Sequence, residues 1–224
     1  MSKSFVKGFV SLLLVSCSLA AFAAETANNS TKGWFAGISL GRSRISVDDT
    51  AITDPLTAGG FTGISSSKDT QESAGKIYGG YRLSRNFAVE FGYADLGRFK
   101  FDGSAASPTG AVYEGDFRSK GLNFDALGLL PVGESLAFFG RLGGYYSRTT
   151  TRFSSLGTVA FTPGFETERS KNEFNLKAGF GLQWDFSKSF GLRSEYEHYF
   201  KLGDTATTGE FSIDMISIGL TYRF

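Results

Sequence analysis

The sequence of 224 residues is poor in cysteine and histidine, with one of each, and its formal net charge is only +1. The single cysteine, Cys17, lies near the N-terminus. A mature chain without it has no disulfides, so burial or a membrane must stabilise the fold. One histidine without cysteine does not supply the usual zinc ligands, and a near-neutral chain has no electrostatic case for binding nucleic acid. We therefore expect no cofactor, no metal and no nucleic-acid partner.

Long apolar runs are also missing beyond the N-terminus, where no stretch approaches the 18 or so residues of a membrane helix. Residues 1–23 combine Lys3 and Lys7 with an apolar stretch and the element Ala21-Phe22-Ala23, which predicts a cleaved secretory signal. Residues 24–32 then form a short periplasmic segment. The alternative is that "LVSC" (14–17) is a lipoprotein box, with lipidation at Cys17.

Aromatic residues and glycine are abundant instead: 15% of residues are aromatic, and 29 are glycine against 4 proline. Apolar residues recur at every second position in eight segments, which predicts strands. The segments are 34–41, 76–83, 87–94, 122–130, 138–147, 174–184, 190–199 and 216–224. An even number of such strands is typical of an outer-membrane barrel.

The connections distinguish this barrel from a soluble β-sandwich. Short connections (84–86, 131–135 and 185–189) alternate with long ones (about 43–74, 98–120, 149–172 and 200–213). We therefore predict an all-β fold for residues 33–224: a transmembrane antiparallel up-and-down β-barrel of eight strands, with short periplasmic turns and long extracellular loops. The nearly uncharged face meets lipid and lipopolysaccharide, and the polar face lines the lumen.

Aromatic residues of the apolar face cluster at two heights, as expected at the two bilayer interfaces. Near the short turns lie Trp34, Tyr81, Phe87, Trp184 and Tyr222; near the other end lie Tyr93, Tyr146 and Tyr196.

The segments "WFAGISLG", "YGGYRL", "FGYADLGRF", "LRSEY" and "LTYRF" occur in the order of the strands of OmpA-type outer-membrane proteins, which the chain therefore resembles. The resemblance implies an integral protein of the bacterial outer membrane after Sec-type export. It also implies recognition by the barrel-assembly machinery through Gly219, Leu220, Tyr222 and Phe224. Many members continue into a peptidoglycan-binding domain, which we do not expect here.

The family's barrels carry an interior network of acidic and basic side chains. Glu90, Arg141, Arg193 and Glu195 match it by position, whereas Leu127 replaces an interior lysine and Gln183 an interior acid. Because side chains alternate between the two faces of a strand, the positions of five further residues also predict that they point inward: Arg82, Asp125, Lys177, Glu197 and Arg223. These charges either fill a packed barrel or line a narrow conducting path.

Three functions remain open. The first is a non-enzymatic role in envelope structure, with or without weak passage of small solutes. The second is a surface adhesin or receptor that binds an unknown extracellular ligand through its loops. The third is an outer-leaflet lipid hydrolase using His198 and Ser194, but four residues along a strand separate these side chains by about 13 Å. Asp48, Asp49 and Asp54 are either a weak cation site or loop charges.

Overall fold

The computed structural model describes residues 32–46, 65–68, 70–105, 111–156, 168–202 and 211–224. The predicted signal segment 1–23, Cys17, nearly all of segment 24–32 and the three loop aspartates lie outside these ranges. The strands are β1 (Gly33–Ser46), β2 (Ser65–Lys68), β3 (Gln71–Arg82), β4 (Phe87–Ala105), β5 (Ala111–Val132), β6 (Leu136–Leu156), β7 (Glu168–Asp185), β8 (Phe190–Leu202) and β9 (Phe211–Arg223). Within the described part of the chain, no helix is long and apolar enough to cross a membrane.

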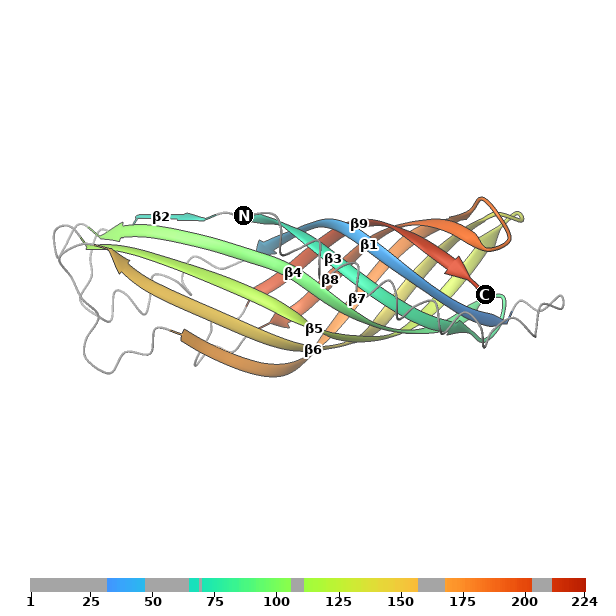
Figure 1. Cartoon of the computed structure of the whole chain (residues 1–224), viewed down its shortest axis with the longest axis horizontal. Coiled ribbons are helices and arrows are strands. Elements are labelled where there is room, and N and C mark those ends of the chain that lie inside the picture. Colours follow the sequence, from blue (N-terminus) through green and yellow to red (C-terminus); the bar gives the residue numbers. More distant parts are fainter. Residues whose placement is uncertain (1–31, 47–64, 69, 106–110, 157–167, 203–210) are drawn as a thin grey trace, which may run out of the picture.

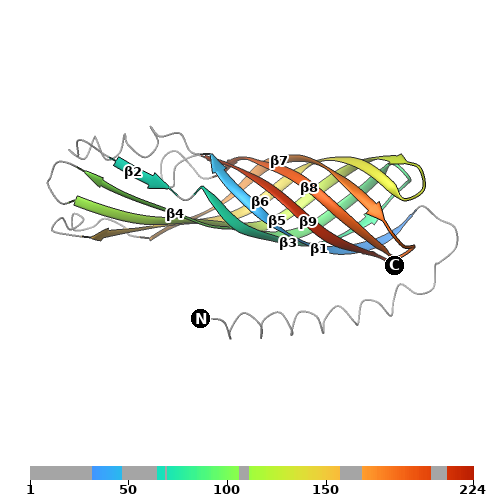
Figure 2. The same ribbon diagram turned by 90° about the horizontal axis from the view of Figure 1, so that it is seen from above.

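Eight of these strands form a closed antiparallel barrel, as predicted (Figures 1 and 2). Each strand pairs with its neighbours in the order β1-β3-β4-β5-β6-β7-β8-β9, and β9 returns to β1. At this seam Phe35 lies opposite Arg223, and the Phe224 N–H donates to the Trp34 carbonyl at 3.1 Å. Closure satisfies the backbone polar groups that an open edge would expose to hydrocarbon.

Tight connections join the strands at one end, where β3–β4, β5–β6 and β7–β8 meet. Gly133, between β5 and β6, has φ +73°, a conformation that glycine adopts without a steric penalty. In the β3–β4 turn, Ser84 Oγ accepts the N–H groups of Asn86 and Phe87. The three short turns predicted from the sequence are confirmed.

The predicted long connections are wrong in extent, because strands occupy much of them. Residues 98–105 and 111–120 belong to β4 and β5, and 149–156 and 168–172 belong to β6 and β7. The antiparallel ladder continues past the apolar band, from Arg98 opposite Arg118 to Arg152 opposite Glu168. β4, β5 and β6 therefore project beyond the rest of the barrel, and β2 pairs with β4 on this projection (Figures 1 and 2).

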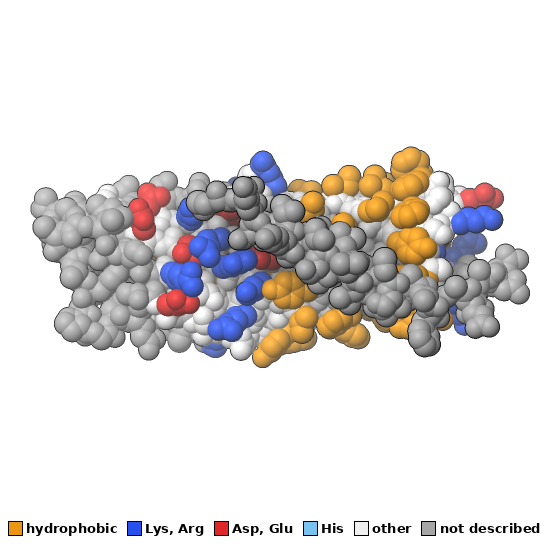
Figure 3. Space-filling view, viewed as in Figure 1, with side chains coloured by type: hydrophobic (Ala, Val, Ile, Leu, Met, Phe, Trp, Pro, Cys, Tyr) orange, Lys and Arg blue, Asp and Glu red, His pale blue; other side chains and the backbone are white. Residues whose placement is uncertain are grey.

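The two faces of the strands differ as the alternation predicts. Leu40 and Phe174 are 67% and 69% exposed on the outer wall, whereas Lys177 and Glu197 are fully buried inside. The outward apolar side chains form a band around the short-turn half of the barrel (Figure 3).

The lumen is not lined by polar residues alone, which corrects the expectation from sequence. A lower cluster near the short turns consists of Phe35, Tyr78, Ala88, Leu127, Leu129 and Phe139. An upper cluster at the opposite end consists of Ile45, Ala74, Ala94, Leu96, Phe99, Phe117, Tyr145, Tyr199, Leu202, Phe211, Ile213 and Met215.

Inward-facing glycines make room for the aromatic rings of the lower cluster. A Cβ added at Gly37 would lie 2.5 Å from the Tyr78 ring, and one at Gly181 would lie 2.5 Å from the Phe139 ring. An eight-stranded barrel is only wide enough for side chains to fill. The pairing of small with large residues therefore packs the lumen.

Candidate functional site in the barrel lumen

A layer of eight buried ionisable side chains lies between the two apolar clusters. Its members come from six strands and are Lys76, Arg141, Lys177 and Arg193 with Glu90, Asp125, Glu195 and Glu197. Four cations thus face four carboxylates. We call this set the charged layer.

Arg141 of β6 is the centre of the charged layer. Its Nη1 lies 2.7 Å from Glu197 Oε1, and its Nη2 lies 2.8 Å from Glu90 Oε1 and 3.2 Å from Glu195 Oε2. Gly179 of β7 stands between β6 and β8, and a Cβ there would come within 3.2 Å of Arg141 Cγ. The missing side chain at Gly179 lets Arg141 reach across β7 to Glu197.

The two lysines bind the same carboxylates from other directions. Lys76 Nζ lies 2.9 Å from Glu195 and 2.8 Å from Glu197. Lys177 Nζ lies 2.7 Å from Glu197 and 2.9 Å from Asp125. Glu197 therefore meets three cations, and the removal of any one leaves a buried charge with fewer partners.

Aromatic rings connect the charged layer to the clusters on either side. The Arg193 guanidinium lies 4.8 Å from the centre of the Tyr78 ring and 5.1 Å from that of Phe139, both in the lower cluster. Lys177 Nζ lies 5.3 Å from the Tyr199 ring of the upper cluster. Such cation–π contacts add to the attraction of the carboxylates, so the layer and the clusters pack as one core.

The structure brings most of the predicted lumen residues into the charged layer, namely Glu90, Asp125, Arg141, Lys177, Arg193 and Glu195. Gln183 lies at its lower edge, where its Oε1 accepts from Arg193 Nη2 at 3.0 Å. Arg82 is only half-buried at the short-turn end and makes no ion pair with any described residue. Leu127 belongs to the lower cluster.

Sequence reasoning did not single out Lys76. The signal was present, because Lys76 shares its inward parity with Tyr78 on β3. A lysine at the edge of an apolar segment usually indicates the end of a strand, however. Only the contacts with Glu195 and Glu197 of β8 show why Lys76 is buried.

Comparison with known proteins assigns the barrel to a family. Residues 29–224 match the family model described as the OmpA-like transmembrane domain. The chain belongs to this family. It is therefore an integral β-barrel of the bacterial outer membrane, with its short turns on the periplasmic side.

Outer membrane protein A from Klebsiella pneumoniae is 28% identical over 192 residues, covering 85% of this chain and 51% of that protein. The protein of the same name from Serratia marcescens is also 28% identical over 192 residues, covering 85% and 49%. The OmpA-like chain thus spans about half the length of these relatives.

Solved structures agree on the fold alone. Neisserial surface protein A superposes with a TM-score of 0.55 at 13% identity, covering 86% of this chain and 97% of that one. OprG from Pseudomonas aeruginosa gives a TM-score of 0.51 at 12% identity, covering 87% and 96%. Ail, the attachment invasion locus protein of Yersinia pestis, gives 0.50 at 16% identity, covering 86% and 99%.

On the outer wall, the predicted belt residues lie toward the two ends of the apolar band. At the short-turn end, Trp34 packs edge-on against Tyr81 with 5.0 Å between ring centres, and Phe190 and Phe224 flank Tyr222 at 5.1 and 5.0 Å. Phe87 and Trp184 are exposed at the same end, and Tyr93 and Tyr146 are exposed near the other. Gly219 faces the lumen, whereas Leu220, Tyr222 and Phe224 face outward.

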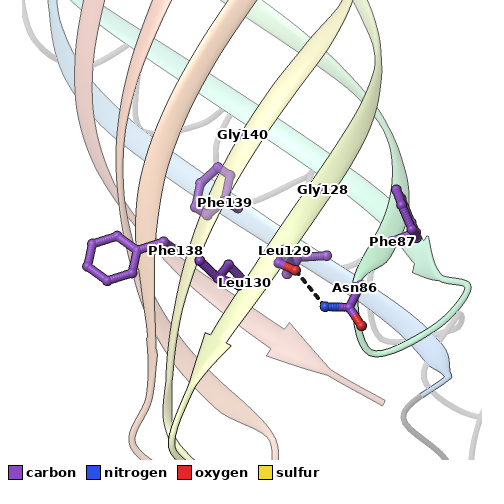
Figure 4. Close-up of a pocket in the computed structure, with 8 residues that line it drawn as sticks. All are labelled: Asn86, Phe87, Gly128, Leu129, Leu130, Phe138, Phe139 and Gly140. Atoms are coloured by element: carbon purple, nitrogen blue, oxygen red, sulfur yellow. Dashed lines mark hydrogen bonds between the residues drawn. The ribbon is translucent and has the colours of Figure 1, made fainter.

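A shallow depression lies on the wall at the short-turn end and includes Asn86, Phe87, Leu130 and Phe138 in its lining (Figure 4). Asn86 Nδ2 donates to the Leu129 carbonyl at 3.0 Å, while Phe138 and Phe139 point to opposite sides of β6 (Figure 4). The phenyl and aliphatic groups that line it suit contact with lipid chains. Across the described ranges, no cluster of His, Cys, Asp or Glu is arranged to hold a metal ion.

His198 has a partner that sequence reasoning missed. Its Nδ1 lies 2.6 Å from Asp214 Oδ1, which also accepts the Tyr196 hydroxyl at 2.6 Å. Ser194 instead lies opposite Ile218, four residue pairs further along the β8–β9 ladder. The structure therefore does not join His198 and Ser194 into a nucleophile–base pair.

Proposed function

We propose that this OmpA-like barrel is a non-enzymatic structural protein of the outer membrane whose lumen is sealed. One observation carries the proposal: the charged layer is buried between two apolar clusters, and every one of its members is ion-paired. An aqueous path would have to separate these pairs and also pass both clusters. The breaking of buried ion pairs is costly, so the packed state is favoured over weak passage of small solutes.

Planar-bilayer recording of the refolded barrel tests this proposal. We expect the wild type to remain silent while its heat-dependent shift in gel mobility shows that it is folded. Discrete openings that change with Glu90→Gln or Arg193→Gln, but not with the exposed turn variant Arg85→Gln, would instead establish a conducting lumen lined by the charged layer.

A second candidate is a loop-mediated adhesin or receptor, which the projection of β4, β5 and β6 favours. These strands carry a rigid surface beyond the apolar band, and binding residues often lie on segments held by a rigid scaffold. Replacement of residues 102–114 by a tight turn should abolish adhesion of expressing cells, while the barrel still folds, if this role is correct. Unchanged adhesion would reject it.

The hydrolase has less support, since His198 faces Asp214 rather than a nucleophile. Lipid A extracted from cells that overproduce the barrel should be unchanged in mass. Loss of an acyl chain that depends on His198 would contradict the non-enzymatic proposal.

A further inference from the structure

Lys120 of β5 and Arg148 of β6 form a pair of like charges on the outer wall. They are direct partners in the β5–β6 ladder, and both face outward. The Cβ atoms of such a pair lie about 5 Å apart, and like charges placed in this way are destabilising. An anion placed between the two side chains would remove this repulsion.

The neighbouring carboxylates do not compensate the pair. Asp95 is the β4 partner of Lys120, but its Oδ2 accepts from Arg118 and its Oδ1 accepts the Gly97 N–H at 3.1 Å. Asp116 lies near Arg98 at 3.6 Å. Neither the Lys120 nor the Arg148 side chain has an ion pair or hydrogen bond with the described parts of the chain.

The height of the pair on the barrel indicates what compensates it. Two residues toward the membrane on the same face lie Leu122 and Tyr146, which are 43% and 52% exposed and are themselves ladder partners. That step is about 7 Å along a strand. Lys120 and Arg148 therefore lie directly above the apolar band on the extracellular side. Charged side chains of both signs begin beside this band in Figure 3.

The opposite wall is balanced at the corresponding level. There Arg44 lies opposite Asp214, which also contacts His198. Arg42, one step closer to the apolar band on β1, lies opposite Ser73 and Ile216 and is a single cation. Among the described residue pairs of that wall no two cations face each other directly, whereas Lys120 and Arg148 do.

We propose that Lys120 and Arg148, with Leu122 and Tyr146 below them, bind the phosphorylated head group of lipid A in the outer leaflet. A phosphate between the ammonium and guanidinium groups would remove their repulsion, since both residues bind phosphate readily. The apolar residues would meet the acyl chains of the same lipid. This inference rests on the placement of the barrel in the outer membrane but not on whether its lumen conducts.

Native mass spectrometry of the full chain in a neutral maltoside detergent tests the site, with lipid A and chemically dephosphorylated lipid A as probes. We expect wild type to prefer the phosphorylated probe. Lys120→Gln with Arg148→Gln should weaken its binding by roughly ten- to thirty-fold, since each cation contributes about 1 kcal/mol at an anionic surface. The control Arg85→Gln with Lys188→Gln removes the same charge from the periplasmic turns and should leave binding unchanged.

Equal loss in both double variants would mean a general charge effect and would overturn the site. Equal binding of the two lipid probes by wild type would also overturn it. Inorganic pyrophosphate serves as a soluble probe without acyl chains. If wild type bound pyrophosphate as tightly as lipid A, the assignment of the site to a lipid would be contradicted. In lipid-free micelles the Lys120/Arg148 variant should be at least as stable as wild type, so loss of binding will not reflect misfolding.

Discussion

Glu90 and Arg193 bridge the barrel across its full width. Their strands, β4 and β8, are four places apart in the ring of eight, yet Arg193 Nη1 lies 2.6 Å from Glu90 Oε2. Arg141 completes the bridge from β6, at 2.8 Å from the other oxygen of Glu90. A contact of this kind ties opposite walls together, which the backbone ladder between adjacent strands does not do.

Neutralisation of the central arginine should destabilise the barrel strongly. Arg141→Gln leaves Glu90, Glu195 and Glu197 buried with fewer cations, and we expect the free energy of unfolding to fall by about 3–5 kcal/mol. Urea unfolding in phospholipid vesicles measures the loss. Arg152→Gln, which breaks a solvent-exposed pair with Glu168, should have no measurable effect, and equal effects of the two changes would contradict the central role of Arg141.

A methyl group at Gly179 should disturb the charged layer. Its Cβ would lie 2.5 Å from the Tyr196 carbonyl oxygen and 3.2 Å from Arg141 Cγ, so Gly179→Ala should cost about 1–3 kcal/mol of stability. Gly140→Ala is the matched control, because the nearest atom to its Cβ is 4.0 Å away. The same unfolding assay should show little change for Gly140→Ala; a neutral Gly179→Ala would mean that the layer tolerates displacement of Arg141.

The stability of the barrel should depend on Asp214 in acid. Partial burial opposes its charged form, but hydrogen bonds from Tyr196 and His198 and the charges of His198 and Arg44 lower the pKa of this carboxyl group. Asp214 lies beyond the lipid-exposed Ile216, outside the apolar band. Because its pKa is lower in the folded state, the stabilisation is present above the unfolded value of about 3.9 and is lost as pH falls through the folded pKa.

The free energy of unfolding, measured from roughly pH 6 to pH 2, should therefore fall less steeply for Asp214→Asn than for wild type. Asp102→Asn, at an exposed position of β4, should leave the slope unchanged. Parallel curves for wild type and Asp214→Asn would show that the Tyr196–Asp214–His198 contacts contribute nothing to the folded state.

The terminal aromatic should matter for assembly more than for stability. Phe190 and Phe224 contact the same ring of Tyr222 at nearly equal distances, 5.1 and 5.0 Å. If Phe224 is read by the barrel-assembly machinery, Phe224→Ala should slow insertion into proteoliposomes that contain the machinery, whereas Phe190→Ala should not. Spontaneous refolding into detergent should be similar for both, and equal insertion rates would remove the support for a C-terminal signal.

The sequence by itself determined the barrel and the facing of its strands. A period of two forces side chains onto opposite faces, so the alternation alone places apolar residues such as Leu40 and Phe174 toward lipid and Lys177 and Glu197 toward the interior. The spacing of the alternating segments also predicts which connections are short turns. Strand length did not, because β4, β5 and β6 continue through polar segments in which cross-strand pairing, rather than hydropathy, maintains the ladder.

Only the tertiary structure decided what fills the lumen and which charges meet. The alternation of the strands places Glu90 and Arg193 inside, but closure of the ring sets their heights. These heights bring two side chains 103 positions apart in the sequence into contact. The same closure places Lys76 of β3 beside Glu197 of β8. Register between distant strands is a property of the closed barrel, and no local pattern contains it.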